Sequence, residues 1–210
     1  MARKEAQNPE TPQRILAAAE ASFAASGLAG ARTERIASRA GVNKALLYYY
    51  FGSKRNLYRA VLRHLLEELR RAIVPSGATP RSARERLEAF VGGYFDFLAS
   101  HPNYPRLIQR EVMESQSELG WILRDYQRPL LRAFIAILEA GVREREFRRI
   151  DPEQASLSVF GAMVSYFAAA PLWSRFLGRD LLRPAALEAR RRALLDFLSY
   201  GLLPPSKRAS

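Results

Sequence analysis

Residues 42–54 read VNKALLYYYFGSK and place two lysines among three consecutive tyrosines and a phenylalanine. If this segment is a helix with about 3.6 residues per turn, its side chains divide between two faces. One face is flat and is formed by Lys44, Ala45, Leu46, Tyr48 and Tyr49. The opposite face is apolar and is formed by Leu47, Tyr50 and Phe51. Phenol hydroxyls, an ammonium group and one methyl suit hydrogen bonds to phosphate and close approach to a major groove. The alternative, that all four aromatic rings pack in a core, gives no reason for Tyr48 and Tyr49 to be exposed.

Catalytic chemistry has little support in this sequence. It contains no glycine-rich phosphate loop, no H-E-x-x-H metal motif and no serine nucleophile elbow. Its lack of cysteine excludes disulfides, zinc–thiolate sites and cysteine nucleophiles. His64 is expected in a helix and His101 in a loop, while Glu111 and Glu114 are expected to be solvated or paired with arginines such as Arg110. We therefore predict a protein that is not an enzyme, with no catalytic residue, no metal site and no cofactor.

Helix start and stop signals predict an all-α fold. Ala, Leu, Arg and Glu dominate the composition, and no strand-like alternation is present. A first helix is expected to run from the Thr11-Pro12 pair to Gly27, and the three helices that follow are expected to have their N-caps at Thr33, Asn43 and Ser53. Two short helices separated by Ala40-Gly41-Val42 are typical of a helix-turn-helix. The helix that begins at Ser53 should reach about residue 74.

The net charge of +12 indicates a polyanionic partner. Residues 1–74 hold 13 Lys and Arg against 6 Asp and Glu, and residues 75–210 hold 20 against 15. The positive charge is therefore denser in the predicted helix-turn-helix region. For the second region, an arginine-rich composition that merely reflects a GC-rich genome is an alternative reading.

The segment TERIASRAGVNKALLYYYFGSKRNLY, residues 33–58, resembles the DNA-binding domain of the tetracycline-repressor (TetR) family. Its pattern, T-x-x-I-A-x-x-A-G-V-[S/N]-K followed by Y-x-Y-F and a lysine, requires many residues at fixed offsets. The resemblance implies a homodimeric repressor whose third helix enters the major groove and whose C-terminal domain binds an inducer. It implies a three-helix helix-turn-helix domain at residues 1–55, a linking helix at 53–74, and a larger helical effector-binding and dimerisation domain at 56–210.

The same resemblance assigns roles to individual residues of this chain. Thr33 and Lys54 would bind backbone phosphates, and Tyr48 and Tyr49 would contact phosphate and base. Lys44, Ala45 and Leu46 would lie near base edges. Members of the family often carry a small polar residue where this chain has Leu46, so readout there could be apolar, against a thymine methyl.

Beyond residue 75, helices are expected at 81–99, 103–115, 118–146, 152–171 and 184–202. If the first three pack together, their aromatic side chains can line an effector pocket, although such stripes are also ordinary core. The proposed lining residues are Tyr94, Phe97, Tyr104, Ile108, Trp121 and Tyr126. The Gly92-Gly93 pair inside a helix costs roughly 1 kcal/mol per glycine relative to alanine. Room for a ligand, close helix packing or a kink would each explain it.

Residues 154–174 contain no charged side chain and are nominally long enough to cross a bilayer. Gln154, three serines and Pro171 dilute their hydropathy, so we expect no membrane span. Small residues favour instead a helix in a dimer interface, paired with the helix at 184–202; burial in the core of a monomer is the alternative. The expected interface residues are Leu157, Phe160, Gly161, Val164, Leu187, Leu194 and Phe197.

These observations lead to the hypothesis of a cytoplasmic homodimeric repressor, which a small apolar or aromatic effector releases from a palindromic operator. The N-terminal MARKEAQNPE has no apolar segment of the kind that signal peptides contain. The alternative is an architectural protein that binds DNA without specificity and without an effector. The sequence leaves open the effector, the operator, the target genes, the number of dimers per site and the choice between repressor and activator.

Overall fold

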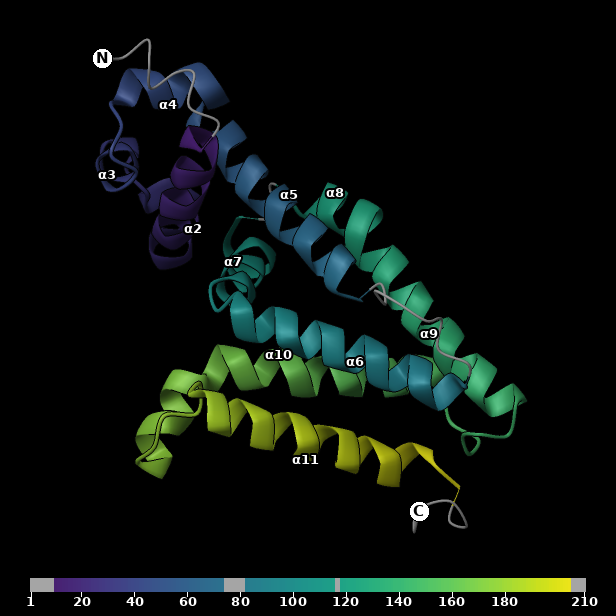
Figure 1. The fold of residues 1–210 in the computed structure, drawn as a ribbon. Helices are drawn as coiled ribbons and strands as arrows, with labels where there is room; N and C mark the ends of the chain where they lie inside the picture. Colours follow the sequence, from purple (N-terminus) through teal and green to yellow (C-terminus); the bar gives the residue numbers. More distant parts are fainter. Residues whose placement is uncertain (1–9, 74–81, 116–117, 205–210) are drawn as a thin grey trace. The chain divides into compact units, whose positions relative to one another are not determined.

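The computed structural model describes residues 10–73, 82–115 and 118–204, which form helices joined by short turns (Figure 1). These ranges contain no strand, so the all-α prediction is confirmed. The first four helices are α2 Thr11–Gly30, α3 Thr33–Arg39, α4 Lys44–Phe51 and α5 Lys54–Ile73. The later helices are α6 Ala83–Ser100, α7 Tyr104–Arg110, α8 Leu119–Ile122, α9 Arg128–Arg143, α10 Pro152–Leu177 and α11 Pro184–Leu202.

The chain forms two compact units, and neither is continuous in sequence. Unit 1 contains the residues up to Glu67 together with Asn103–Gly120, and unit 2 contains Glu68–Pro102 together with the residues from Trp121 on. This division differs from the predicted boundary between residues 55 and 56. The polypeptide passes between the units three times, first within α5.

The caps of the short helices are partly as predicted. The Asn43 side chain accepts a hydrogen bond from Leu46 N at 2.8 Å, and Ser53 Oγ accepts one from Asn56 N at 3.1 Å. Thr11 and Thr33, in contrast, are the first residues of α2 and α3, whose N-cap positions are Glu10 and Arg32. The predicted N-cap is therefore wrong by one residue for both threonines, which are buried, with exposed fractions of 1% and 6%.

Two glycines adopt positive φ where the helix-turn-helix changes direction. Gly27, at φ 66°, interrupts α2 at the residue where the sequence predicted its end. Gly41, also at φ 66°, forms the turn between α3 and α4, in which Val42 N donates to Ala37 O at 3.0 Å. Side chains other than glycine are strained in this conformation, so the predicted Ala40-Gly41-Val42 turn depends on Gly41.

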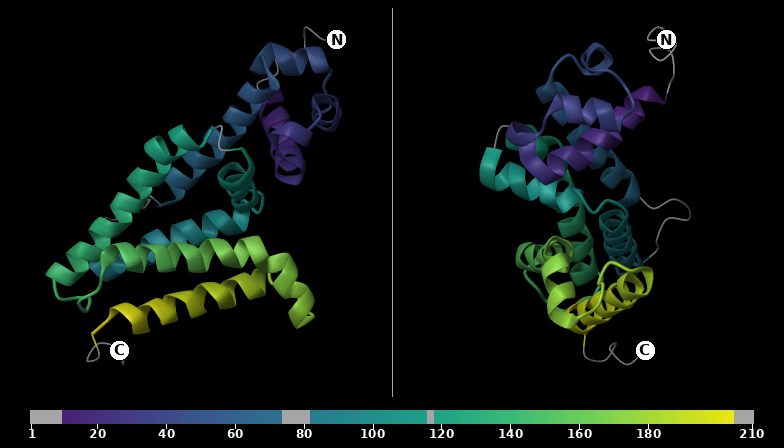
Figure 2. Two further views of the ribbon diagram at one scale, coloured as in Figure 1. Left: turned by 180° about the vertical axis from the view of Figure 1, so that it is seen from behind. Right: turned by 90° about the vertical axis from the view of Figure 1, so that its left-hand side faces the viewer.

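Aromatic and aliphatic side chains fill the core of each unit. In unit 1, Ile15, Ala19 and Phe23 of α2 are fully buried, and the Phe23 ring meets Tyr58 edge to face at 5.0 Å. In unit 2, Phe90 and Tyr94 of α6 pack against Phe160 of α10, with centroid distances of 6.3 and 5.5 Å. Both ribbon views show α6, α10 and α11 running beside one another within unit 2 (Figures 1 and 2).

Two helix predictions in unit 2 need correction. The helix expected at 118–146 runs without a gap from Leu119 to Arg143, but a π-helical turn at Leu123–Gln127 joins α8 to α9. The helix expected to end at Pro171 continues to Leu177, because a proline removes one hydrogen bond without preventing the helix from resuming. Near that end α10 changes direction (Figure 2), as expected of a proline kink.

Close packing explains the paired glycines of α6. A Cβ on Gly93 would collide with the backbone carbonyl of Ala72 in the last turn of α5, and a Cβ on Gly92 would lie 2.6 Å from Arg191 Nη2. Of the three explanations that the sequence left open, the structure supports close approach of neighbouring segments.

We expect Gly93→Ala to lower the free energy of unfolding by about 1–3 kcal/mol. The new methyl group would collide with the backbone of Ala72, which cannot move aside as a flexible side chain can. Gly201→Ala in α11 is the matched control, since a Cβ there meets nothing within 4 Å. Urea unfolding of both variants measures the difference. Equal stability of the two would contradict the packing explanation.

Candidate nucleic-acid interface

Helix α4 has the two faces that the sequence predicts. Leu47 is completely buried, whereas Tyr49 is 74% exposed and Tyr48 36% exposed. Lys44 and Ala45 are exposed as well, so four of the five residues predicted on the flat face reach solvent. Tyr50 and Phe51 are only half-buried, and their rings pack against each other at 6.4 Å.

Leu46 is the exception on the predicted DNA face. Its exposed fraction is 6%, so its side chain packs inside unit 1. Leu46 therefore offers no methyl group to a thymine, and that expectation is wrong. At about 3.6 residues per turn, Leu46 lies at the edge of this face, where a small rotation of the helix decides between burial and exposure.

The contacts of Thr33, Lys44 and Tyr48 join α3 to α4. Thr33 Oγ1 lies 3.3 Å from the Tyr48 hydroxyl, and the Lys44 ammonium lies 5.8 Å from the centre of the Tyr48 ring. Lys44 also forms an exposed ion pair with Glu34. The hydrogen bond between them lowers the pKa of Glu34 and raises the pKa of Lys44. A phosphate group must compete with Glu34 for Lys44.

Lys54 joins α5 to the end of α2 within unit 1. Its ammonium donates to Ala29 O at 3.2 Å and to Ala31 O at 3.1 Å, and thereby fastens the α2–α3 connection to the first turn of α5. An ammonium has three donors, so one remains for a phosphate. Replacing Lys54 would thus remove contacts within the fold as well as any contact with DNA.

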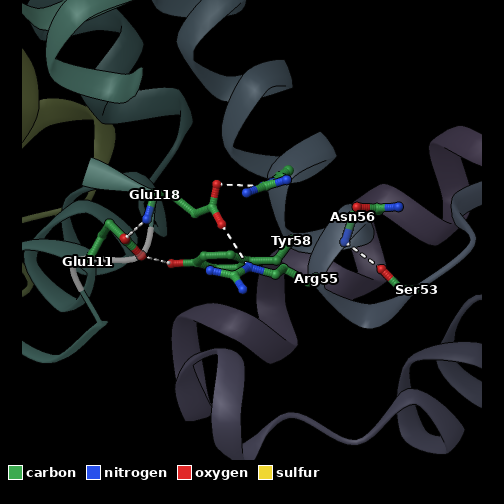
Figure 3. A network of polar contacts seen from close by, with 7 residues as sticks. Ser53, Arg55, Asn56, Tyr58, Glu111 and Glu118 are labelled. Carbon is green, nitrogen blue, oxygen red and sulfur yellow. Dashed lines mark hydrogen bonds and ion pairs between the residues drawn. The ribbon is translucent and has the colours of Figure 1, made fainter. Parts of the chain in front are cut away.

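A network of polar contacts that the sequence did not reveal lies between α5 and the segment at 103–120 (Figure 3). Glu111 and Glu118 are both completely buried, so of the two alternatives expected for Glu111, solvation is wrong. The Tyr58 hydroxyl donates to Glu111 Oε2 at 3.1 Å, and the backbone N–H of Glu118 donates to Glu111 Oε1. Burial, followed by the charge of Glu111, raises the pKa of Tyr58.

Two arginines of α5 complete this network. Arg55 Nε donates to Glu118 Oε1 at 3.1 Å, and Arg59 Nε donates to Glu118 Oε2 at 2.6 Å. Both arginine side chains remain about half exposed, at 54% and 46%. The i,i+4 spacing of the two arginines places them on one face of α5, and this spacing was the only sign of the network in the sequence. Their partner Glu118 could not be predicted, because it lies some sixty residues away.

The predicted effector residues are divided between the two units. Tyr94 and Phe97 are buried in unit 2, where Phe97 stacks on His101 at 4.4 Å. Trp121 and Tyr126, also in unit 2, are half-buried with ring centroids 5.8 Å apart. The remaining two predicted residues, Tyr104 and Ile108, belong to unit 1.

The predicted dimer residues fall into two groups. Leu157, Gly161 and Phe197 are exposed, and Val164 and Leu187 are half-exposed. Phe160 is half-buried and its ring lies 5.2 Å from that of Phe134, whereas Leu194 is buried and is not a surface residue. An open groove of about 710 Å³ lies between α10 and α11 and is lined largely by alanines.

Helix α10 is also the one helix in the described ranges that is long and apolar enough to cross a membrane. Only 28% of its most apolar window is buried. Its buried stripe, which includes Met163 and Phe167, faces the core of unit 2.

No group of three or more His, Cys, Asp or Glu side chains suited to a metal ion occurs among the residues described. Those residues include His64, exposed on α5 in unit 1, and His101 in unit 2. The geometry defines instead a helix-turn-helix whose second helix, α4, presents tyrosines and a lysine on its outer face. Such proteins bind DNA.

Comparison with known proteins identifies the family. Residues 15–61 match the family described as "Bacterial regulatory proteins, tetR family", and residues 84–198 match "Tetracyclin repressor-like, C-terminal domain". The chain is 32% identical over 199 residues to the HTH-type transcriptional repressor SCO4008 of Streptomyces coelicolor, covering 89% of this chain and 97% of that protein. The chain belongs to the tetR family and is a DNA-binding transcriptional regulator, which confirms the resemblance found in residues 33–58.

Solved structures of regulators share this fold. The ketosteroid transcriptional regulator KstR2 of Mycobacterium tuberculosis superposes with a TM-score of 0.75 at 24% identity, covering 94% of this chain and 97% of that one. A transcriptional regulator from Saccharomonospora viridis, crystallised in complex with choline, has a TM-score of 0.74 at 20% identity and covers 94% and 100%. The all-helical architecture is thus that of known regulators.

We expect Tyr49→Phe to weaken DNA binding by about 1 kcal/mol, or roughly fivefold, because it removes one hydroxyl that can donate to DNA. Its melting temperature should stay unchanged, since the side chain is 74% exposed. Fluorescence anisotropy with labelled DNA and thermal unfolding measure the two effects. Tyr58→Phe is the matched control and should destabilise the protein, because that hydroxyl is bonded to buried Glu111. A lower melting temperature for Tyr49→Phe would show that Tyr49 belongs to the core.

Proposed function

We propose that this protein is a cytoplasmic homodimeric repressor that binds a palindromic operator and leaves it when a small apolar or aromatic effector binds. The observation that carries the proposal is the outer face of α4, where exposed Tyr48 and Tyr49 lie opposite completely buried Leu47. Helix-turn-helix dimers place two such faces in successive major grooves, so operator symmetry follows from protein symmetry. The repressor assignment rests on the similarity to SCO4008.

Five of the residues assigned to DNA fit this proposal without change, and one fits with a second role. Lys44, Ala45, Tyr48 and Tyr49 lie on α4, and Lys54 is at the start of α5. Thr33 is 6% exposed and touches the Tyr48 hydroxyl, so it would act on phosphate mainly by orienting that phenol. Leu46 is left out because it is buried.

We further propose that the groove between α10 and α11 receives a second copy of the chain. Ala162, Ala169, Ala189 and Ala193 line it, and small side chains let helices approach closely. The same two helices carry large exposed apolar side chains, among them Leu157, Leu172, Phe176, Phe197 and Tyr200. Exposed apolar side chains gathered on one helix pair are typical of an interaction site. It also accounts for the apolar character of α10 without a membrane.

The effector is proposed to bind in unit 2, near its aromatic side chains. Trp121 and Tyr126 are half-buried and therefore remain reachable by a small molecule. The regulator from Saccharomonospora viridis, which shares the fold, was crystallised in complex with choline, and this supports a small-molecule effector. Release requires that the effector bind the DNA-incompetent conformation more tightly than the competent one.

Selection of bound sequences from a random duplex pool tests the DNA-binding proposal. An inverted repeat should emerge, with half-site centres one helical turn or a multiple apart. Footprinting should then show a discrete protected site. Recovery of no preferred sequence, with uniform salt-sensitive coating, would favour the architectural alternative.

The dimer proposal predicts that Ala193→Glu converts the protein to a monomer, because the longer side chain would fill space that the alanines of the groove leave for a partner helix. The affinity for the operator should fall as well, because a monomer binds one half-site whereas a dimer binds both half-sites at once. Light scattering coupled to size exclusion measures the mass. Ala136→Glu on exposed α9 is the control and should stay dimeric. An unaffected mass for Ala193→Glu would place the interface elsewhere.

A further inference from the structure

Glu34 is the only acidic residue between Glu20 and Glu67, a stretch of the sequence that contains eight Lys and Arg. An acidic side chain in so basic a stretch opposes the binding of a polyanion, so its presence there needs a reason. Glu34 lies on α3, its side chain is 62% exposed, and its carboxylate accepts a hydrogen bond from the Lys44 ammonium. The one acid of this stretch is therefore paired with the first residue of α4.

Two contacts hold the Lys44 ammonium in place, and Thr33 connects them. The first contact is the ion pair with Glu34, and the second is the ring of Tyr48, whose centre lies 5.8 Å away. Thr33 Oγ1 donates to Glu34 Oε2 at 3.5 Å and lies 3.3 Å from the Tyr48 hydroxyl. A lysine side chain loses much rotamer freedom when it is ordered. The three neighbours order Lys44 before DNA arrives.

We propose that Glu34 determines specificity by directing Lys44 to a guanine and withholding it from the phosphates of random DNA. An ammonium has three donors, of which Glu34 takes one. The two that remain match the N7 and O6 acceptors of guanine in the major groove. The inference rests on the proposed function, because Lys44 reads a base only if the N-terminal residues of α4 reach base edges in the major groove.

The same ion pair makes Lys44 a poor ligand for random DNA. A phosphate beside α4 gains Lys44 only after the ammonium has left Glu34. A lysine that is already neutralised by a carboxylate also releases few counterions from DNA, so it adds little to the salt dependence of binding. A base contact through the two remaining donors leaves the ion pair intact.

The decisive variant is Glu34→Gln in the full-length protein, which removes the charge and keeps the size of the side chain. Affinity for a random duplex should rise roughly threefold to fivefold, the range expected when an exposed ion pair no longer has to be broken. The dependence of log affinity on log salt should become steeper by about one unit for each Lys44 that gains a phosphate. Fluorescence anisotropy across a salt series measures both.

On the operator, Glu34→Gln should give no gain in affinity, because Lys44 loses the group that orients it toward the base. The ratio of operator to random-DNA affinity should thus fall roughly threefold or more. Selection from a random duplex pool should lose the preference for guanine at one position of each half-site. The melting temperature should stay unchanged, since Glu34 and Lys44 are both exposed.

A double-mutant cycle with Lys44→Gln tests whether Glu34 acts through Lys44. In the Lys44→Gln background, the further change Glu34→Gln should alter neither the affinity ratio nor the salt slope. The control is Glu88→Gln, which removes the same charge from the exposed Arg84–Glu88 pair of unit 2 and should leave the ratio and the slope intact.

An equal rise on both DNAs with the guanine preference intact would show that Glu34 only repels DNA, and would overturn the proposal. Unchanged affinities, a rise on random DNA that persists without Lys44, or a fall on both DNAs with a lower melting temperature would overturn it as well. Failure of the proposed function looks different, because the unmodified protein would then select no operator at all.

Discussion

Burial of two carboxylates against α5 is the constraint on which the DNA-binding unit depends. Carboxylates are stable in a protein interior only when hydrogen bonds and opposite charges replace the lost water. Tyr58, Arg55 and Arg59 supply these partners from α5, and the backbone of Glu118 supplies another. Helix α5, which follows α4, therefore carries the side chains that bind Glu111 and Glu118 from a distant part of the chain. The helix-turn-helix and that segment form one folded object.

Sequence patterns correctly predicted the features that depend on interactions between residues close together in the chain. Asn43 and Ser53 cap their helices, Gly41 forms the turn, and Tyr49 is exposed because helical periodicity puts it opposite Leu47. Leu46 was misplaced because it lies near the margin of a face, where tertiary packing decides burial. The roles in DNA contact remain predictions, since they depend on a partner molecule.

The features that sequence reasoning missed depend on residues far apart in the chain. Glu111 looks like a surface residue until its contact with Tyr58, 53 positions earlier, is known. From the sequence alone, Gly93 is expected only to destabilise α6; the structure shows that the Ala72 carbonyl occupies the place where a Cβ would lie. Pro171 reads as a helix end, yet α10 continues beyond it to Leu177. Each case requires the tertiary arrangement, which helical periodicity does not contain.

The discontinuous composition of unit 1 bears on the engineering of new regulators from parts of old ones. A chimera joined near residue 67 would combine the recognition helix of this chain with a foreign segment in place of Asn103–Gly120. Arg55 and Arg59 would then face a surface that evolved with different charges, and Tyr58 would lose its acceptor. A functional exchange has to transplant both stretches, so the smallest portable DNA-binding module of this protein has two pieces.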